Sequence, residues 1–247
     1  MRNLELNSDC ILSSYDSGYE STVFNYSDPK HYDDIVLFKL FNDFKHVNPN
    51  FLENKRNKLE IISTLDVFKD DVQILDLLYK NGKFCGYTMV KSDSKPISMF
   101  DKRKKKLLQL KAIRDKIELL NSNDIYIGDF NEKNFLCSGD SNIQLCDLDN
   151  LRIGDLDFDV MDNAAKKFMK KCKNIRYIDS YCFNIFTVSF LDRYDMAYLM
   201  DYFCTSHLPR EFDTKKNEEI FRQMVLLDKD YTGEFFIDNP QKRVFKN

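Results

Sequence analysis

The pattern of apolar residues changes near residue 96 of this 247-residue chain, and that change limits the folds open to it. Before it, short runs of β-branched and aromatic residues are separated by polar turns, a pattern typical of strands. After it, apolar residues recur at helical spacing. The strands predicted in the first part are residues 11–14, 21–26, 35–41, 72–79 and 84–90.

Two local signals refine the first part of the chain. A helix is predicted over residues 50–65, because Pro49 marks its start and apolar side chains then recur near helical spacing. Asn81 and Gly82 predict a hairpin turn between the last two strands, because Asn-Gly supplies the positive φ angles that such a turn demands. The first part is therefore expected to be a small antiparallel sheet with one helix.

The second part of the chain is predicted to be mainly helical. Residues 105–120 carry one apolar stripe of leucine and isoleucine, and the pattern becomes helical again from residue 160. Short strands are predicted between these segments, at residues 125–127, 135–137 and 143–146.

These patterns together predict an α+β chain that forms a single domain over residues 1–247, with two lobes. The first lobe, residues 1–90, would hold the small sheet and its helix. A polar linker follows at residues 91–97, and residues 98–247 would form a larger, mainly helical lobe. Within that lobe, residues 205–247 suggest no task.

Composition and charge argue against several classes of protein. Hydrophobic residues make up 43% of the chain and charged residues 31%, which is typical of a globular domain. No apolar run is long enough to span a bilayer, and the first ten residues lack the apolar core of a signal peptide. We therefore expect a cytoplasmic protein without a membrane partner. The net charge of −3 and the one short basic run, residues 102–106, argue against a nucleic-acid partner.

Cysteine and histidine usage argues against a disulfide framework and against zinc. The chain has seven cysteines, an odd number, and no two of them form a C-x-x-C pair. We expect them to be reduced thiols in or near the core. The three histidines are scattered, so a zinc site is not expected.

Polar side chains follow two short apolar strands in the second part of the chain. Asp129 and Asn134 come after the strand at residues 125–127, and Asp147 comes at the end of the strand at residues 143–146. Asp and Asn favour turns in general, but the strand-like residues before each Asp direct these carboxylates inward from a core. Carboxylate and amide oxygens suit a Mg²⁺ ion held against phosphates, and the first carboxylate could orient or deprotonate an attacking hydroxyl.

These two segments resemble the signature motifs of the protein-kinase-like superfamily. Residues 128–134, Gly-Asp-Phe-Asn-Glu-Lys-Asn, resemble the catalytic loop H-R-D-x-x-x-x-N, and residues 146–149, Cys-Asp-Leu-Asp, resemble the segment that carries D-F-G. The match is closer to a small prokaryotic subgroup that has G-D-x-N-x-x-N and D-x-D. The resemblance extends over residues 14–191 and implies the bilobal protein-kinase-like fold.

Two segments of the first lobe resemble the phosphate-binding parts of that family. Gly18, Ser21 and Val23 lie where the family has its glycine-rich phosphate loop. The run Val-Leu-Phe-Lys that ends at Lys39 resembles V-A-I-K, which makes Lys39 the lysine on the α and β phosphates of ATP.

Other family landmarks follow in the expected order. The helix after Lys39 offers Glu53 and Glu60 as carboxylate partners of that lysine; they share a helix face, and Glu60 fits the usual spacing better. Met89 lies in a segment that resembles the hinge strand that holds adenine. Residues 179–184 resemble the D-x-Y-S-x-G start of the central helix of the large lobe.

The resemblance implies an enzyme that uses ATP and Mg²⁺ to transfer the γ-phosphate to a hydroxyl acceptor on a protein or a small molecule. Asp129 would orient or deprotonate the hydroxyl, and Asn134 and Asp147 would hold the metal ion. Lys39, with one of the two glutamates, would anchor the phosphates.

Several positions depart from the family pattern and keep other functions open. Gly18 is the one glycine left of the three in the phosphate loop, Asn131 stands where protein kinases have a lysine, and Asp149 replaces the glycine of D-F-G. These departures keep open a pseudokinase that binds a partner, and a transferase of AMP on the same fold. Residues 148–159 also resemble a stretch of aminoglycoside and choline-type phosphotransferases, which keeps a small-molecule kinase open. A protein Ser/Thr kinase-like activity is the leading expectation.

Overall fold

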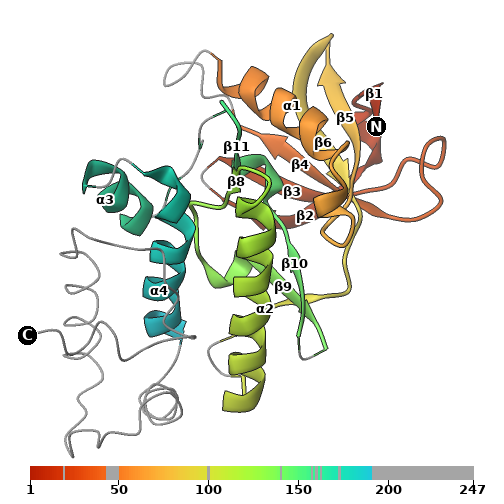
Figure 1. Cartoon of the computed structure of the whole chain (residues 1–247). Helices are drawn as coiled ribbons and strands as arrows, with labels where there is room; N and C mark the ends of the chain where they lie inside the picture. The colour runs from red at the N-terminus through yellow and green to blue at the C-terminus, as the bar shows by residue number, and fades with distance from the viewer. Residues whose placement is uncertain are drawn as a thin grey trace, which may run out of the picture. The chain divides into compact units, whose positions relative to one another are not determined.

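The chain divides into two compact units (Figure 1). The first unit is Met1–Asp93 with Leu145–Asp149, and the second is Ser94–Gln144 with Asn150–Asn247. The predicted linker, residues 91–97, contains the first crossing between them. The structure is a computed structural model and describes residues 1–18, 20–42, 50–98, 101–139, 141–156, 158, 161, 163–171 and 174–190. The predictions made for residues 191–247 lie outside this set.

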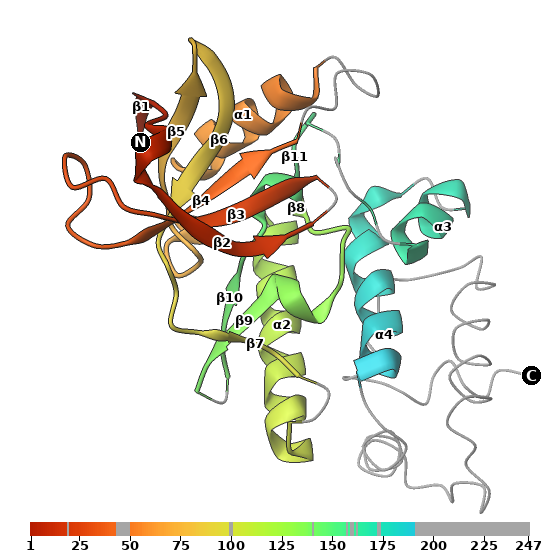
Figure 2. The ribbon, with the colours of Figure 1, turned by 180° about the vertical axis from the view of Figure 1, so that it is seen from behind.

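The first unit contains a six-stranded sheet with the strand order β1-β5-β6-β4-β3-β2 (Figure 2). Neighbouring strands are antiparallel, except that β1 at one edge pairs parallel to β5. The strands are β1 (Arg2–Glu5), β2 (Ile11–Ser17), β3 (Ser21–Tyr26), β4 (Val36–Phe41), β5 (Ile74–Lys80) and β6 (Lys83–Met89).

Five of these six strands confirm the predicted runs, with ends that differ by three residues or fewer. The predicted hairpin between β5 and β6 is also confirmed, since Asn81 has a φ of 53° and Gly82 a φ of 70°. The pattern misses β1, because its four residues, Arg-Asn-Leu-Glu, do not alternate between apolar and polar. Backbone pairing to β5 holds this strand in place.

The register of β3, β4 and β6 assigns their side chains to the two faces of the sheet. Val23 on β3 is opposite Lys39 on β4, and Lys39 is opposite Tyr87 on β6. Leu37, two residues before Lys39, is opposite Met89. Directly paired residues and residues two apart point to the same side, so these five side chains share one face.

The other face of the sheet carries a hydrophobic core cluster. Burial of such side chains is the main favourable contribution to folding. The buried members of the cluster are Cys10, Tyr26, Val36, Phe38 and Leu78.

One α-helix, α1 (Phe51–Ile62), packs against β6 in the first unit (Figure 1). It confirms the predicted helix, which ends three residues earlier than expected. The ring of Phe51 meets the ring of Phe41 edge-on, with 6.1 Å between centroids. Because Phe41 is two residues from Lys39 on β4, α1 covers the sheet face that carries Lys39.

The second unit is mainly helical within its described residues. Its helix α4 packs against both α2 and α3, and its strands form a three-stranded sheet β10-β9-β7 and a pair β11-β8. The elements are β7 (Lys95–Pro96), α2 (Arg103–Asn121), β8 (Ile125–Tyr126), β9 (Phe135–Ser138), β10 (Asn142–Leu145), β11 (Arg152–Ile153), α3 (Asn163–Lys171) and α4 (Ile178–Phe190). Short 3₁₀ helices among the described residues of both units are η1 (Ser8–Cys10), η2 (Asp66–Phe68), η3 (Glu132–Asn134), η4 (Leu148–Asn150) and η5 (Ile175–Tyr177).

The apolar stripe predicted over residues 105–120 is confirmed as the buried face of α2. Leu110, Ile113, Ile117 and Leu120 are fully buried, as their helical spacing requires. The three predicted short strands are confirmed as β8, β9 and β10. The pattern misses β7 and β11, because two residues are too few to show alternation.

The described residues thus form a mixed α+β chain, as predicted. Within the part of the chain that the structure describes, no helix combines the length and the apolar character needed to cross a bilayer.

Candidate functional site

The segment that follows β10 is held by the first unit. The backbone N–H of Leu145 donates to the buried carboxylate of Asp71 at 2.7 Å, and the N–H of Val72 donates to the carbonyl oxygen of Leu145 at 3.2 Å. Asp147, two residues further on, has a φ of 62°, a left-handed conformation that is uncommon outside glycine. Such strained backbone clusters at functional sites, where the surrounding structure holds it in place.

Lys39 extends from β4 to two carboxylates of that segment. Its Nζ contacts Oδ1 of Asp147 and lies 2.7 Å from Oδ1 of Asp149, and 5% of Lys39 is exposed. Burial alone would lower the pKa of Lys39, but the charges of the two aspartates outweigh it, and the pKa lies well above its ordinary value of 10.5. The side chain is therefore a fixed positive charge shielded from solvent.

Asp149 is the most deeply buried carboxylate of this group, with no solvent exposure. Its Oδ1 also accepts a hydrogen bond of 2.9 Å from the hydroxyl of Tyr87, and its Oδ2 lies 2.8 Å from Nζ of Lys55. Burial alone would raise the pKa of Asp149, but the charges of Lys39 and Lys55 outweigh it, and the pKa lies below its ordinary value. Burial and the charge of Asp149 raise the pKa of Tyr87 well above 10, so its hydroxyl remains a neutral donor.

Lys55 reaches Asp149 from α1 and is itself fully buried. Its Nζ lies 3.4 Å from Oε2 of Glu20 and 3.3 Å from the backbone carbonyl oxygen of Asp149. The ring centroids of Phe41 and Phe51 lie 5.7 and 5.3 Å from the same Nζ, so two aromatic faces add to its stabilisation. Sequence reasoning missed Lys55 as a site residue, although its place four residues after Phe51 puts both on one helix face.

The two glutamates expected to pair with Lys39 point to solvent instead. The side chains of Glu53 and Glu60 are 65% and 49% exposed and lie 3.7 and 3.8 Å from Arg56 on the same helix. Residues three and four apart share a helix face, and this face is the outer one. The prediction that one of these glutamates pairs with Lys39 rests on their spacing from Lys39 along the chain, and the structure contradicts it. The fully buried carboxylate at Lys39 is that of Asp149.

The residues expected at the phosphate loop and at the hinge lie in the strands of the sheet that carries Lys39, except Gly18, which lies in the turn after β2. Gly18 and Ser21 close the hairpin between β2 and β3, where the N–H of Gly18 donates to the carbonyl oxygen of Ser21 at 2.9 Å. A Cβ added to Gly18 would lie 3.8 Å from that oxygen, an ordinary contact. Val23, half-buried, and Met89, buried, are apolar side chains on the face that carries Lys39.

Asp129 and Asn134 come together in the second unit. The side-chain nitrogen of Asn134 donates to Oδ2 and to the backbone carbonyl oxygen of Asp129, both at 3.1 Å. The side-chain nitrogen of Asn131 donates to the same Oδ2, also at 3.1 Å. These bonds fix the orientation of the Asp129 carboxylate. They also make the side-chain oxygen of Asn134 the atom that would face a cation.

Gly128 makes a tight turn directly before Asp129. The N–H of Asp129 donates to the carbonyl oxygen of Ile127 at 2.8 Å, and Gly128 between them has a φ of 64°. A three-residue turn with positive φ is rare and strained. A Cβ at this position would also lie 2.4 Å from the ring of Phe158. Glycine is therefore required here by both backbone conformation and space.

The first turn of α4 anchors this tight turn. Asp179 is fully buried, and its carboxylate accepts hydrogen bonds from the backbone N–H of Ile127, at 2.9 and 3.0 Å, and of Gly128, at 3.1 Å. The expected helix start at residues 179–184 is confirmed by α4. Asp179 thus connects that helix to the loop that carries Asp129.

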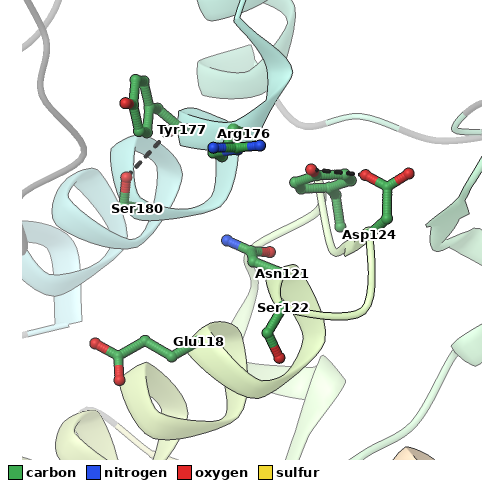
Figure 3. A pocket seen from close by; sticks show the side chains of 8 residues that line it. Glu118, Asn121, Ser122, Asp124, Arg176, Tyr177 and Ser180 are labelled. Carbon is green, nitrogen blue, oxygen red and sulfur yellow. Dashed lines mark hydrogen bonds between the residues drawn. The ribbon is translucent and has the colours of Figure 1, made fainter.

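An open pocket of about 690 Å³ lies at the C-terminal end of α2 (Figure 3). Glu118, Asn121 and Asp124 line it from α2 and the turn that follows, and Arg176 and Ser180 line it from η5 and α4. None of the residues predicted from the sequence to bind or act lines this pocket.

The described residues contain no group of three or more His, Cys, Asp or Glu side chains that could hold a metal ion. Mg²⁺ does not need such a group, because it keeps several waters and is bound through one or two carboxylates together with substrate phosphates. The side chain of Asp147 is 29% exposed, and its carboxylate is a donor type that Mg²⁺ prefers.

No protein-family model matches this chain, and no curated protein sequence matches it. What the protein does is therefore inferred from two groups of its own residues. One is the buried lysine and aspartate group of the first unit, and the other is the Asp129 cluster of the second.

Proposed function

We propose that this protein is a cytoplasmic, ATP- and Mg²⁺-dependent phosphotransferase with a bilobal protein-kinase-like fold, and that it transfers the γ-phosphate of ATP to a hydroxyl acceptor. The observation that carries the proposal is the contact between Lys39, buried on β4, and Asp147, which follows β10 in a left-handed backbone conformation. To bind nucleotide phosphates together with their metal ion, a site requires a lysine in a fixed position beside an aspartate that can bind the metal.

The sheet face around Lys39 suits a nucleotide. A base needs apolar surroundings, and phosphates need cations and N–H donors close by. Val23 and Met89 are apolar and share the face of Lys39. We assign Val23 and Met89 to the adenine base and Lys39 to the α and β phosphates. The hairpin that contains Gly18 and Ser21 would cover the phosphates.

The second group of residues supplies the remaining chemistry. Asp147 and Asn134 would provide oxygen ligands for Mg²⁺, which when bound neutralises charge on the phosphates. Asp129 would orient the acceptor hydroxyl and accept its proton. Its carboxylate is already oriented by the side-chain nitrogens of Asn131 and Asn134, so little reorganisation is needed when the acceptor binds.

We favour a hydroxyl on a protein as the acceptor, because the start of α4 resembles the corresponding helix of protein kinases. A small hydroxyl compound of the aminoglycoside or choline type is the alternative acceptor. Transfer of AMP in place of phosphate is the alternative reaction. All three share the nucleotide site and differ in what the second unit binds.

One observation favours a second candidate function, a pseudokinase that binds a partner. The Nζ of Lys39 contacts Asp147 as well as Asp149, so a metal ion at Asp147 would have to compete with this ion pair. A chain in which that ion pair persists would bind nucleotide weakly and transfer nothing.

The proposed function is tested by incubating the purified protein with Mg²⁺ and ATP labelled at the γ or the α phosphate. Its own chain, a cell lysate and small hydroxyl compounds serve as acceptors. Asp129→Asn and Asp147→Ala are the controls, each checked by circular dichroism for a native fold. We expect label from the γ phosphate, lost in both variants. Label from the α phosphate would indicate AMP transfer, and thermal stabilisation by Mg²⁺-ATP without transfer would indicate a pseudokinase. Neither transfer nor stabilisation would overturn the proposed nucleotide site.

A further inference from the structure

Lys55 and Asp149 form a buried charge pair to which the proposed reaction assigns no role. Asp149 lies between two ammonium groups, with Oδ1 2.7 Å from Nζ of Lys39 and Oδ2 2.8 Å from Nζ of Lys55. Lys55 and Asp149 both have no solvent exposure. A phosphate or an acceptor therefore cannot contact them, and any effect they have on the reaction must pass through a neighbouring residue.

The residue through which they would act is Lys39. A buried carboxylate loses its hydration and needs positive charge nearby to offset that loss. Lys39 contacts both Asp147 and Asp149, so its single charge is shared between two carboxylates. Lys55 supplies a second cation, so that an ammonium group lies within 3 Å of each oxygen of Asp149, at 2.7 Å from Oδ1 and 2.8 Å from Oδ2. The hydroxyl of Tyr87 adds a hydrogen bond to Oδ1. Without Lys55, Asp149 would be under-compensated and would draw Lys39 further toward itself.

The place of Lys55 on α1 supports this role. Lys55 lies on the inner face of the helix, with its Nζ 5.3 Å from the ring centroid of Phe51, whereas Arg56 lies on the outer face beside Glu53 and Glu60. Lys55 is thus the side chain of α1 that reaches the group around Lys39, and its carboxylate partner, Asp149, comes from the segment after β10.

We propose that Lys55 is a positioning residue of the nucleotide site: acting through Asp149, it holds the ammonium group of Lys39 in the position that receives the phosphates of ATP. This inference rests on the proposed function. It makes the placement of α1 a condition for phosphate binding, because movement of the helix would remove Lys55 from Asp149.

The experiment compares Lys55→Met, which removes the charge and keeps the length of the side chain, with Arg56→Met on the outer face of the same helix. We expect Lys55→Met to lower kcat/KM for ATP about 100-fold, mainly through a higher KM, because a displaced lysine binds the phosphates poorly. Arg56→Met should retain wild-type kinetics. Lys55→Gln, which also removes the charge, replaces Lys55→Met if the latter does not fold, and the same rise in KM is expected.

A double variant tests whether Lys55 acts through Asp149. If it does, the double variant Lys55→Met with Asp149→Asn should have a kcat/KM no lower than that of the more impaired single variant, because the carboxylate that needs Lys55 is gone. Losses that multiply would overturn the inference, as would wild-type kcat/KM in a folded Lys55→Met protein. A wild-type chain with neither transfer nor stabilisation by Mg²⁺-ATP would overturn the proposed function together with this inference, so the two failures are distinguishable.

Discussion

At the residue scale, two positions beside the proposed chemistry adopt positive φ in different ways. Gly128, before Asp129, has a φ of 64° and carries no Cβ that could clash. Asp147 has a φ of 62° and does carry a Cβ, so contacts with neighbouring residues must hold this strained backbone conformation in place. The contact with Lys39 and the backbone anchoring of Leu145 on Asp71 supply that restraint.

The first prediction concerns the space at Gly128. Gly128→Ala should lower the free energy of unfolding by about 2–4 kcal/mol, because it adds a left-handed alanine and a clash with the ring of Phe158. The matched control is Gly139→Ala, since Gly139 has a φ of 72° and nothing within 4 Å of an added Cβ. The control should lose about 1–2 kcal/mol. Urea unfolding of both variants measures the difference, and equal losses would show that Phe158 moves aside without cost.

The sequence pointed to some residues of the candidate site and not to others, for physical reasons. Asp129 and Asn134 lie five residues apart in one loop, so their contact is a local property that a motif can carry. Lys55 is different, because a lysine in a helix is most often solvated, and its burial depends on what packs against α1. The motif comparison treats Asp149 as a departure from a glycine, and its contacts depend on two lysines that are distant in the sequence.

At the scale of elements, α4 is connected to the loop before Asp129 by the Asp179 carboxylate. Asp179→Asn should lower the free energy of unfolding by about 2–3 kcal/mol, because the new amide nitrogen would face the backbone N–H groups of Ile127 or Gly128. Phosphate transfer should fall as well, since the loop loses its anchor. Stabilisation by Mg²⁺-ATP should persist, because the residues assigned to the base and to the α and β phosphates belong to the first unit.

The control for Asp179→Asn is Asp115→Asn on α2, whose side chain is 63% exposed. This substitution should change the free energy of unfolding by about 0.5 kcal/mol or less. Denaturant unfolding, labelled-phosphate transfer and thermal shift with Mg²⁺-ATP are measured on both variants. Wild-type transfer by Asp179→Asn would contradict the anchoring role assigned to this carboxylate.

The elements themselves follow from the sequence wherever a pattern is long enough to repeat. Residues 105–120 of α2 contain several turns of one apolar stripe, and β3 matches its predicted bounds at both ends. β1 is not found in this way, because an edge strand with exposed side chains is held mainly by its backbone pairing. Its parallel pairing with β5 also joins residues more than seventy positions apart, which no local window contains.

At the scale of the whole molecule, the chain returns from the second unit to the first for five residues, Leu145–Asp149. The contacts of Lys39 with Asp147 and Asp149 therefore join residues 108 and 110 positions apart. The position of each residue within its own motif could be predicted, but this return of the chain could not. Stability also depends on pH across the molecule, because several buried or half-buried carboxylates have lowered pKa values.

The last prediction follows from the sign of those shifts. The pKa values lie below their ordinary value of 3.8 for Asp28, Asp76, Asp101 and Asp149. For Asp76, burial alone would raise the pKa, but hydrogen bonds from the side chain and the backbone N–H of Arg2 outweigh it. A lowered pKa means that the folded state favours the ionised form. Its stabilising contribution is present above pH 3.8 and is lost as the pH falls through the folded-state pKa.

We therefore expect the free energy of unfolding in urea to fall between about pH 5 and about pH 2, by about 1.4 kcal/mol for each unit by which a pKa is lowered. Asp76→Asn should reduce this fall, because it removes one of the contributing carboxylates while keeping an oxygen that can accept from Arg2. The comparison uses the difference between the two pH values within each protein, so a uniform loss of stability in the variant does not affect it. A fall of the same size in Asp76→Asn and wild type would show that the bonds between Arg2 and Asp76 contribute nothing to acid sensitivity.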